Sequence, residues 1–255
     1  MNSTAVSPAP TFPAVRHIGF DAPLKWLKLG WRDLWHKPAA SLFYGIAIAV
    51  AGVIILFATM RLPYLFTAAI TGFLLVAPML AAGVYELSRR YLANEPHSLV
   101  ASMLAWKRNP SGLIGFGLLS LLAGTAWQVV SVVLMALFFK GSALAPADMM
   151  LEVVLNPQYT LLFVVYVGVG GVIAALVFAA SVVSMPMLLD RRCDLLTALV
   201  TSINAVAENP LPLAFWGLII MTLTGIGFAT ALIGLIVILP WLGHASFHAY
   251  KDLVE

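Results

Sequence analysis

Five long runs of apolar residues decide what this chain can fold into. They occupy residues 39–60, 64–85, 111–139, 159–189 and 211–243, with at most one formal charge in each. A helix needs about 20 apolar residues to cross the hydrocarbon core of a bilayer, and every run reaches or exceeds that length. The runs therefore predict an all-α membrane protein that crosses the bilayer several times.

Charge content agrees with this class. Only 10% of the 255 residues are charged, whereas soluble domains carry about 25%. The start of the chain is rich in proline, serine and alanine and has nothing to pack, which predicts a disordered tail over 1–20 and a single membrane domain over 21–255. The tail lacks the basic start and apolar core of a secretory signal. The single cysteine, Cys193, excludes a disulfide within the chain.

A short pattern occurs three times, each time at the start of an apolar run. KPAASLFYG begins at residue 37, NPSGLIGFG at 109 and NPLPLAFWG at 209. An aromatic residue and a glycine follow six and seven residues after each proline, and a Pro-x-Leu triplet comes later. The shared positions are Pro38, Pro110 and Pro210; Tyr44, Phe116 and Trp216; Gly45, Gly117 and Gly217; and Pro78, Pro186 and Pro240. The pattern predicts an internal threefold repeat, with units of about 21–90, 96–192 and 194–255.

The proline of each copy has a structural reason. Upstream of it, apolar residues recur at the three-and-four spacing of one helix face. Proline disfavours helical geometry in the preceding residue but suits the first turn of a new helix. Each unit is therefore predicted to contain an amphipathic surface helix, a break, and two membrane-crossing helices. The aromatic residue, about 9 Å into the next helix, is expected near the interface, and the glycine is expected to allow close helix packing.

The first amphipathic segment carries its charges on one side. Its basic face is formed by Lys25, Lys28, Arg32 and His36, and its apolar face by Leu24, Leu27, Trp31, Leu34 and Trp35. A basic face opposite a face of tryptophan and leucine is typical of a helix that lies among lipid headgroups. The alternative is a cytoplasmic helix that packs against the bundle and keeps its charges in water.

Residues 211–250 form one long uncharged stretch. A single helix of this length would measure about 60 Å, twice the hydrocarbon core, so the stretch is expected to turn back near Thr224-Gly225-Ile226-Gly227. The chain then has six membrane segments in three hairpins, each preceded by an amphipathic helix, or five segments if the last stretch counts once. A re-entrant pair that does not cross fully is the alternative, if protein shields its turn.

The basic residues predict the orientation. With six segments and the N-terminus inside, twelve lysines and arginines lie on one side of the membrane and only Arg61 and Lys140 on the other. Lysine and arginine are enriched in cytoplasmic loops. Both termini, and all three amphipathic helices, are therefore expected at the cytoplasmic face.

Two histidines near the C-terminus are the best candidates for chemistry. His244 and His248 are four residues apart on an expected helix, so their imidazoles face the same way, as in a helix that offers two ligands to a metal. A third ligand could come from His36, His97 or Cys193. No glutamate lies between the pair, so no metalloprotease signature is present. Packing or interfacial hydrogen bonding is the alternative. Two axial haem ligands cannot come from positions i and i+4 of one helix.

Basic residues at the expected inner face form a second group of candidates. They are Lys25, Lys28, Arg32, Arg89, Arg90, Arg191 and Arg192. Acidic residues stand beside the arginines, so ion pairs at helix ends are one interpretation. The other is binding of anionic lipid headgroups.

Several function classes find no support in the sequence. The central parts of the apolar runs contain no ionisable residue, and Gln128 is their most polar residue at mid-depth, so ion-coupled transport is not expected. The chain has no Gly-rich phosphate loop, Ser-His-Asp set or CxxC pair, so no enzymatic activity is predicted. The membrane context also argues against nucleic acid as a partner.

Three stretches of the chain resemble a known family. They are Arg16-His17-Ile18 ahead of WLKLGWRDL, the P-x-x-S-L-x-Y-G that begins at Pro38, and the ending GHASFHAYKDLV. They look like the uncharacterised bacterial integral membrane proteins grouped as a domain of unknown function, with Phe247 in place of an expected tryptophan. The resemblance covers most of the chain after residue 15. It implies a bacterial cytoplasmic (inner) membrane and roughly six helices, but no particular activity.

Together these observations predict a non-enzymatic scaffold, accessory or lipid-associated factor. The expected partners are anionic membrane lipids and another membrane complex. No cofactor is expected other than a metal, which would make the protein an accessory or assembly factor for a respiratory complex built on His244 and His248. A further alternative is a transporter of small solutes or lipids, which needs a continuous cavity between the hairpins.

Overall fold

The computed structural model describes residues 12–61, 80–96, 98–139 and 152–254. Within these ranges every regular element is a helix, and the one β-type contact is an isolated antiparallel bridge between Val15 and Val254. The all-α prediction is therefore confirmed.

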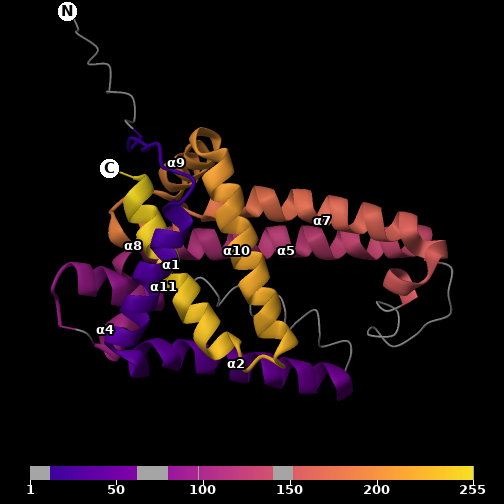
Figure 1. Cartoon of the computed structure of the whole chain (residues 1–255), viewed down its shortest axis with the longest axis horizontal. Coiled ribbons are helices and arrows are strands. Elements are labelled where there is room, and N and C mark those ends of the chain that lie inside the picture. The colour runs from indigo at the N-terminus through magenta and orange to yellow at the C-terminus, as the bar shows by residue number, and fades with distance from the viewer. Residues whose placement is uncertain (1–11, 62–79, 97, 140–151, 255) are drawn as a thin grey trace, which may run out of the picture.

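Figure 1 shows the helices of the described residues. They are α1 (Ala22–His36), α2 (Pro38–Arg61), α4 (Leu99–Met103), η1 (Ala105–Arg108), α5 (Pro110–Phe138), η2 (Pro157–Tyr159), α7 (Thr160–Ser181), α8 (Ser184–Asp190), α9 (Leu195–Glu208), α10 (Pro210–Ala229) and α11 (Leu235–Leu253). Residues 80–92 are also helical. Figure 1 shows α5 and α7 side by side as a long pair, whereas α1, α8, α9 and the C-terminus gather at one end of the molecule.

Four stretches are helical, long and apolar enough to cross a membrane. They are Pro38–Phe57, Pro110–Phe138, Pro157–Asp190 and Pro210–Ala229. Most of the predicted segment 64–85 lies outside the described residues. The second membrane segment predicted within residues 211–250 corresponds to α11, which is not among the four stretches. The described part of the chain is thus a multi-span helical membrane protein with four candidate spans.

The chain breaks where the repeated pattern predicts. Each proline of the pattern is the first residue of α2, α5 or α10. The preceding residue leaves helical geometry in a similar way each time, with φ and ψ of −141° and 77° at Lys37, −148° and 71° at Asn109, and −129° and 53° at Asn209. The proline ring disfavours helical geometry at the preceding position, which explains why a new helix starts there.

The three aromatic residues of the pattern lie in the protein interior, where they contact other side chains; their location at the membrane interface stays a prediction. Tyr44, Phe116 and Trp216 are 2%, 7% and 0% exposed. The hydroxyl group of Tyr44 lies 2.8 Å from Ser102 Oγ, and the ring of Trp216 meets Trp26 edge-on at 5.6 Å between centroids. These rings are buried by packing between the candidate spans and the short helices that precede them.

The three glycines of the pattern differ in their surroundings. A Cβ added at Gly45 would overlap the carbonyl oxygen of Ile236 in α11, so α2 and α11 touch through their backbones there. At Gly217 the nearest atom would be Phe178 Cζ at 3.8 Å, an ordinary contact. Gly117 is buried in α5. The prediction of close helix approach therefore holds at Gly45 and fails at Gly217.

The later prolines of the pattern also differ in context. Pro186 is buried in α8, and Pro240 is buried inside α11. Pro78 lies outside the described residues.

Helix α1 packs through a different face from the predicted apolar one. Trp26, Gly30 and Asp33 are buried, whereas Trp31 and Trp35 are 43% and 49% exposed. Three contacts select the buried face. A Cβ at Gly30 would meet the backbone of Ala245, Trp26 Nε1 donates to Asp252 at 2.9 Å, and Asp33 bonds to α11. Of the predicted apolar face, Leu34 is fully buried, Leu27 is half-buried and Leu24 is 55% exposed.

The last hairpin turns later than predicted. Residues 224–227 are still helical in α10, and the chain reverses over 230–234. Glycines can remain in a membrane helix, so Gly225 and Gly227 do not force a turn. The hydroxyl of Thr230 bonds instead to the carbonyl oxygen of Gly227 (2.9 Å) and accepts from Gly234 N (3.0 Å).

The two described ends of the chain meet. Arg16 N donates to the carbonyl oxygen of Leu253 at 2.9 Å, beside the bridge from Val15. The side chain of Asn209 accepts from Ile18 N and donates to the carbonyl oxygen of Arg16. Within the predicted tail over 1–20, residues 15–18 are thus tied to α9, α10 and α11, while residues 1–11 lie outside the described ranges.

Candidate functional site

Five buried polar side chains meet where α1, α2, α11 and the helix of residues 80–92 converge. They are Asp33, Ser41, Ser88, His244 and His248, and none is more than 5% exposed. Burying so many polar groups is unfavourable unless they bond to one another. We call this set the polar cluster.

Hydrogen bonds connect the polar cluster into one chain. Ser88 Oγ donates to Asp33 Oδ2 at 2.7 Å and lies 2.7 Å from His244 Nδ1. Because the serine proton points to the carboxylate, His244 Nδ1 donates to Ser88. In a neutral ring, His244 Nε2 then accepts from Ser41 Oγ, 2.8 Å away. His248 Nε2 lies 2.9 Å from Asp33 Oδ2 and donates to it.

Asp33 is the charged centre of the polar cluster. Its side chain is 1% exposed, and Oδ1 is buried with no hydrogen-bond partner in the described structure. A buried carboxylate needs an opposite charge close by, and His248 is the ion-pair partner that the structure gives it. Asp33 and His248 thus form a buried hydrogen-bonded pair between α1 and α11.

The predicted histidine pair lies in the polar cluster, but with partners other than those expected. Within the described residues, no three or more histidine, cysteine, aspartate and glutamate side chains are placed to hold a metal. Both ring nitrogens of His244 face serine hydroxyls. Of the proposed third ligands, His36 packs against the ring of Tyr91 at 4.4 Å between centroids, Cys193 packs half-buried against the core, and His97 lies outside the described residues.

Sequence reasoning missed Asp33, Ser41 and Ser88. A signal for Asp33 was present, because Trp26, Gly30 and Asp33 follow a four-and-three spacing on one helix face. An aspartate on the face that also carries a glycine and a tryptophan indicates burial with a partner. Ser41 and Ser88 carry no comparable signal, since serines are common in membrane helices.

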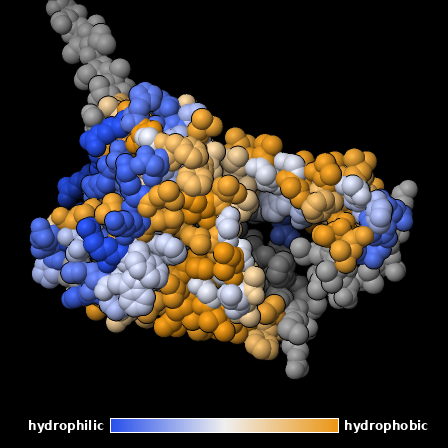
Figure 2. All heavy atoms as spheres, viewed as in Figure 1, coloured by the Kyte–Doolittle hydropathy of each residue, from blue (hydrophilic) through white to orange (hydrophobic). Residues whose placement is uncertain are grey.

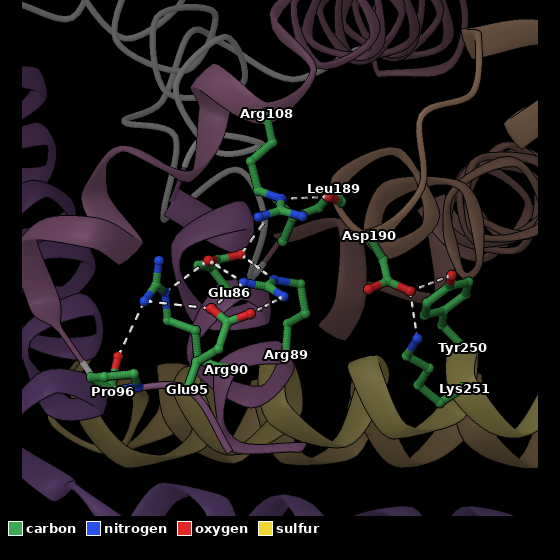
Figure 3. Close-up of polar contacts among 10 residues, drawn as sticks. All are labelled: Glu86, Arg89, Arg90, Glu95, Pro96, Arg108, Leu189, Asp190, Tyr250 and Lys251. Atoms are coloured by element: carbon green, nitrogen blue, oxygen red, sulfur yellow. Dashed lines mark hydrogen bonds and ion pairs between the residues drawn. The ribbon is translucent and has the colours of Figure 1, made fainter. Parts of the chain in front are cut away.

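A second network binds the predicted arginines to acidic side chains (Figure 3). Arg89 forms two hydrogen bonds to Glu86 (2.8 and 2.9 Å) and two to Glu95 (3.0 and 2.8 Å). Arg90 Nε donates to Glu86 at 2.8 Å, and Arg108 Nε donates to the carbonyl oxygen of Leu189 at 3.2 Å. Paired N–H groups on a carboxylate form the strongest class of such contacts.

Charge pairing shifts the protonation of this network. The hydrogen bond from Arg89 lowers the pKa of Glu95, with added attraction from Arg90 and Arg108. The bonds to Glu86 raise the pKa of Arg89. Both shifts favour the charged forms, so the network is an ion-pair cluster at neutral pH.

The remaining predicted headgroup ligands divide into two groups. Arg191 donates to Tyr250 Oη at 2.9 Å and to the carbonyl oxygen of Val254, while Arg192 is exposed. Figure 3 shows Asp190 next to Tyr250 and Lys251, which both donate to its carboxylate. Arg89, Arg90 and Arg191 are thus held by protein partners.

Lys25, Lys28 and Arg32 remain at the surface of α1. Lys25 makes an ion pair with Asp21 at 2.9 Å but is 66% exposed, Lys28 is exposed, and Arg32 lies 5.6 Å from the ring centroid of Tyr91.

Exposed tryptophans accompany these three cations. Trp31 packs edge-on against Trp35 at 5.5 Å and against Trp241 of α11 at 5.0 Å between centroids. We call the three cations together with Trp31, Trp35 and Trp241 the basic–aromatic face. Figure 2 shows hydrophilic residues gathered at the end of the molecule where α1 and the C-terminus lie, and hydrophobic residues over much of the remaining visible surface.

An apolar cavity of about 270 Å³ lies one helical turn from the polar cluster. Tyr44 and Tyr85 line it near Ser41 and Ser88, and Gly243 lines it next to His244. Apart from backbone groups, the hydroxyls of Tyr44, Tyr85, Thr224 and Ser246 are its polar groups.

Comparison with known proteins gives one match. Comparison with curated proteins and with solved structures finds none. Residues 65–190 match a family model described as "Predicted integral membrane protein (DUF2189)". This range excludes the N-terminal and C-terminal stretches on which the resemblance rested. The matched family is nevertheless of the kind expected from the sequence, integral membrane proteins without an assigned function. Over residues 65–190 the chain therefore matches the family of predicted integral membrane proteins called DUF2189, a domain of unknown function.

Proposed function

We propose that the protein is a non-enzymatic, lipid-associated factor of the bacterial inner membrane, and that α1 binds anionic lipid headgroups at the cytoplasmic surface. One observation carries this proposal: Lys25, Lys28 and Arg32 are exposed beside the exposed rings of Trp31 and Trp35. Tryptophan favours the headgroup region, and basic side chains there attract anionic lipid.

Ion pairs within the protein argue against headgroup binding by Arg89 and Arg90. Arg89 and Arg90 have side chains only 12% and 21% exposed and bond to Glu86. A lipid phosphate would have to displace a buried carboxylate to reach them. On α1, Lys28 and Arg32 are exposed, and the ion pair of Lys25 with Asp21 lies at the surface, where a phosphate can replace it. The proposed headgroup site is therefore smaller than the seven residues expected from the sequence.

The same face supports the proposed orientation. The termini meet beside α1, and the N-terminal ends of α2, α5 and α10 all follow short basic or amphipathic helices. With lysine and arginine favoured on the cytoplasmic side, this end of the molecule is proposed to be cytoplasmic. The three similar breaks at Lys37, Asn109 and Asn209 support a threefold repeat in which each surface helix is followed by a pair of membrane segments, six in all.

The proposal predicts a measurable lipid preference. A basic residue near an anionic surface contributes about 1 kcal/mol, so three of them favour anionic lipid by up to about 100-fold. Added salt should reduce the preference, because exposed charges are screened over about 8 Å at physiological ionic strength.

The test compares two triple variants in detergent micelles. Brominated phosphatidylglycerol and brominated phosphatidylcholine quench tryptophan fluorescence where they bind. Wild type should be quenched at lower concentrations of the anionic lipid, and Lys25→Gln/Lys28→Gln/Arg32→Gln should lose that preference. The matched control, Lys25→Arg/Lys28→Arg/Arg32→Lys, keeps the charge and should retain it. Equal quenching by both lipids in wild type would rule out the proposed site.

A further inference from the structure

The turn between α10 and α11 is apolar, although it is exposed on the protein. Phe228 and Ile233 are 62% and 70% exposed, and Ala231 is exposed between them. No charged residue occurs from Leu211 to Tyr250. A turn that projected into water would be expected to carry polar residues.

Most backbone N–H groups of this turn have hydrogen-bond partners in the turn or in the end of α10. Thr230 N donates to the carbonyl oxygen of Ile226, Ala231 N to Phe228 and Ile233 N to Thr230, at 3.0–3.1 Å. Gly234 N donates to Thr230 Oγ1. Leu232 is the one turn residue whose N–H has no partner in the described structure. Hydrocarbon offers no hydrogen bonds, so a turn in the bilayer interior has to supply its own.

The reversal is also short. Ala231 and Leu232 have φ of 51° and 71°, the left-handed region that residues with a side chain rarely adopt. Through this geometry five residues, 230–234, join two helices without a polar loop. The turn therefore has no polar loop that could extend into water.

The depth of the turn follows from its packing on α2. A Cβ added at Gly52 would lie 3.1 Å from Leu232 Cδ1. Gly52 is about 21 Å along α2 from Pro38, and the candidate span continues for about another 8 Å to Phe57. The tip of the hairpin therefore meets α2 before the far end of that span.

The length of the apolar part of α11 agrees with this depth. From Leu235 to Gly243 it covers about 13 Å, less than half of a hydrocarbon core of about 30 Å. His244 then enters the polar cluster. A helix with so short an apolar part cannot cross the bilayer, although α10 is long enough to do so.

We infer that α10 and α11 form a re-entrant hairpin, and that its apolar tip at residues 228–233 contacts lipid acyl chains inside the bilayer. The hairpin enters from the side where α1 and the termini lie and returns to it. This inference is independent of headgroup binding by α1, which concerns the opposite end of the hairpin.

Single cysteines can test the position of the tip. With Cys193→Ser as background, one cysteine is placed at Ala231 in the tip. Gln158→Cys, exposed at the start of α7, and Lys28→Cys, exposed on α1, serve as matched controls. A charged, membrane-impermeant maleimide is applied to intact cells and to inverted vesicles. We expect Gln158→Cys to react from one side and Lys28→Cys from the other, whereas Ala231→Cys reacts from neither until SDS dissolves the membrane.

A second position and a second probe make the result decisive. Ile233→Cys, at a side chain that is 70% exposed, replaces Ala231→Cys if that variant does not elute like wild type in detergent. A nitroxide at either position should collide often with oxygen and rarely with a water-soluble nickel chelate. Labelling of the tip from the side that labels Gln158→Cys would show a full crossing and overturn the inference. Labelling from the Lys28→Cys side would place the tip in water and overturn it as well.

Discussion

At the scale of single residues, Asp33 controls how α1 attaches to the rest of the protein. Its carboxylate accepts from Ser88 and His248 in a site that excludes water. Since neither Asp33 nor His248 meets solvent, the charge on one has to be matched by the other. Removing either partner should therefore lower the free energy of unfolding.

The Asp33–His248 pair predicts strong coupling in a double-mutant cycle. Asp33→Asn and His248→Gln each leave a buried charge unmatched and should each cost about 3–5 kcal/mol. The double variant removes both charges, so it should cost less than the sum by at least about 1 kcal/mol. The free energy of unfolding, measured by SDS titration in mixed micelles, gives all four values. Ser41→Ala is the control and should cost only about 1 kcal/mol; additive single changes would show that no ion pair exists.

Glu95 predicts the pH dependence of the arginine network. Arg89 lowers the pKa of Glu95 from its ordinary 4.5, so the folded state favours the charged carboxylate. The stabilising contribution is complete above the unfolded pKa and is lost as pH falls through the lower, folded value. Unfolding midpoints of wild type and Glu95→Gln should therefore differ at pH 7 and converge as the pH falls below the lowered, folded pKa of Glu95. A gap that stays constant over that range would contradict this assignment.

At the scale of helices, backbone contact at glycine joins α2 and α11. Gly45→Ala should destabilise the protein by about 1–3 kcal/mol, since the new Cβ overlaps the carbonyl oxygen of Ile236 and the helices must separate. Gly171→Ala in α7 is the matched control, because a Cβ there meets nothing within 4 Å. It should stay within about 1 kcal/mol of wild type, on the stabilising side. Thermal unfolding in detergent measures the stability of both variants. Equal losses of stability would contradict the close contact assigned to Gly45.

Helix boundaries were predictable where the backbone itself decides them. Pro38, Pro110 and Pro210 break the chain by local sterics, which any fold must respect. Helix faces were predictable only in part. A hydropathy pattern ranks Trp31 above Gly30, yet Gly30 packs on α11 because close approach of two backbones gains more contact than a partly exposed ring. The polar cluster combines residues up to 215 positions apart, and nothing local brings Ser41 and Ser88 to His244.

At the scale of the whole molecule, the contact between the two ends of the chain constrains the topology. The bridge from Val15 to Val254, and the bond from Arg16 N to Leu253, hold the two described ends together, so we expect an even number of crossings between them. A re-entrant α10–α11 hairpin would contribute none, since it leaves on the side from which it entered. The part of the chain before α9 is then expected to cross an even number of times by itself.

This requirement predicts the outcome of reporter fusions. A reporter active only in the cytoplasm should be active when fused before residue 12 and also after residue 254, because the basic–aromatic face lies at the same end. The same reporter inserted at residue 145, in the connection between α5 and α7, should be inactive, and a reporter active only outside the cytoplasm should show the reverse.

An insertion after Ala231 distinguishes the two forms of the last hairpin: a full pair of crossings would place it outside, whereas a re-entrant tip would disrupt insertion and silence both reporters. Activity of the external reporter there, with both termini inside, would leave the even count intact but exclude the re-entrant hairpin.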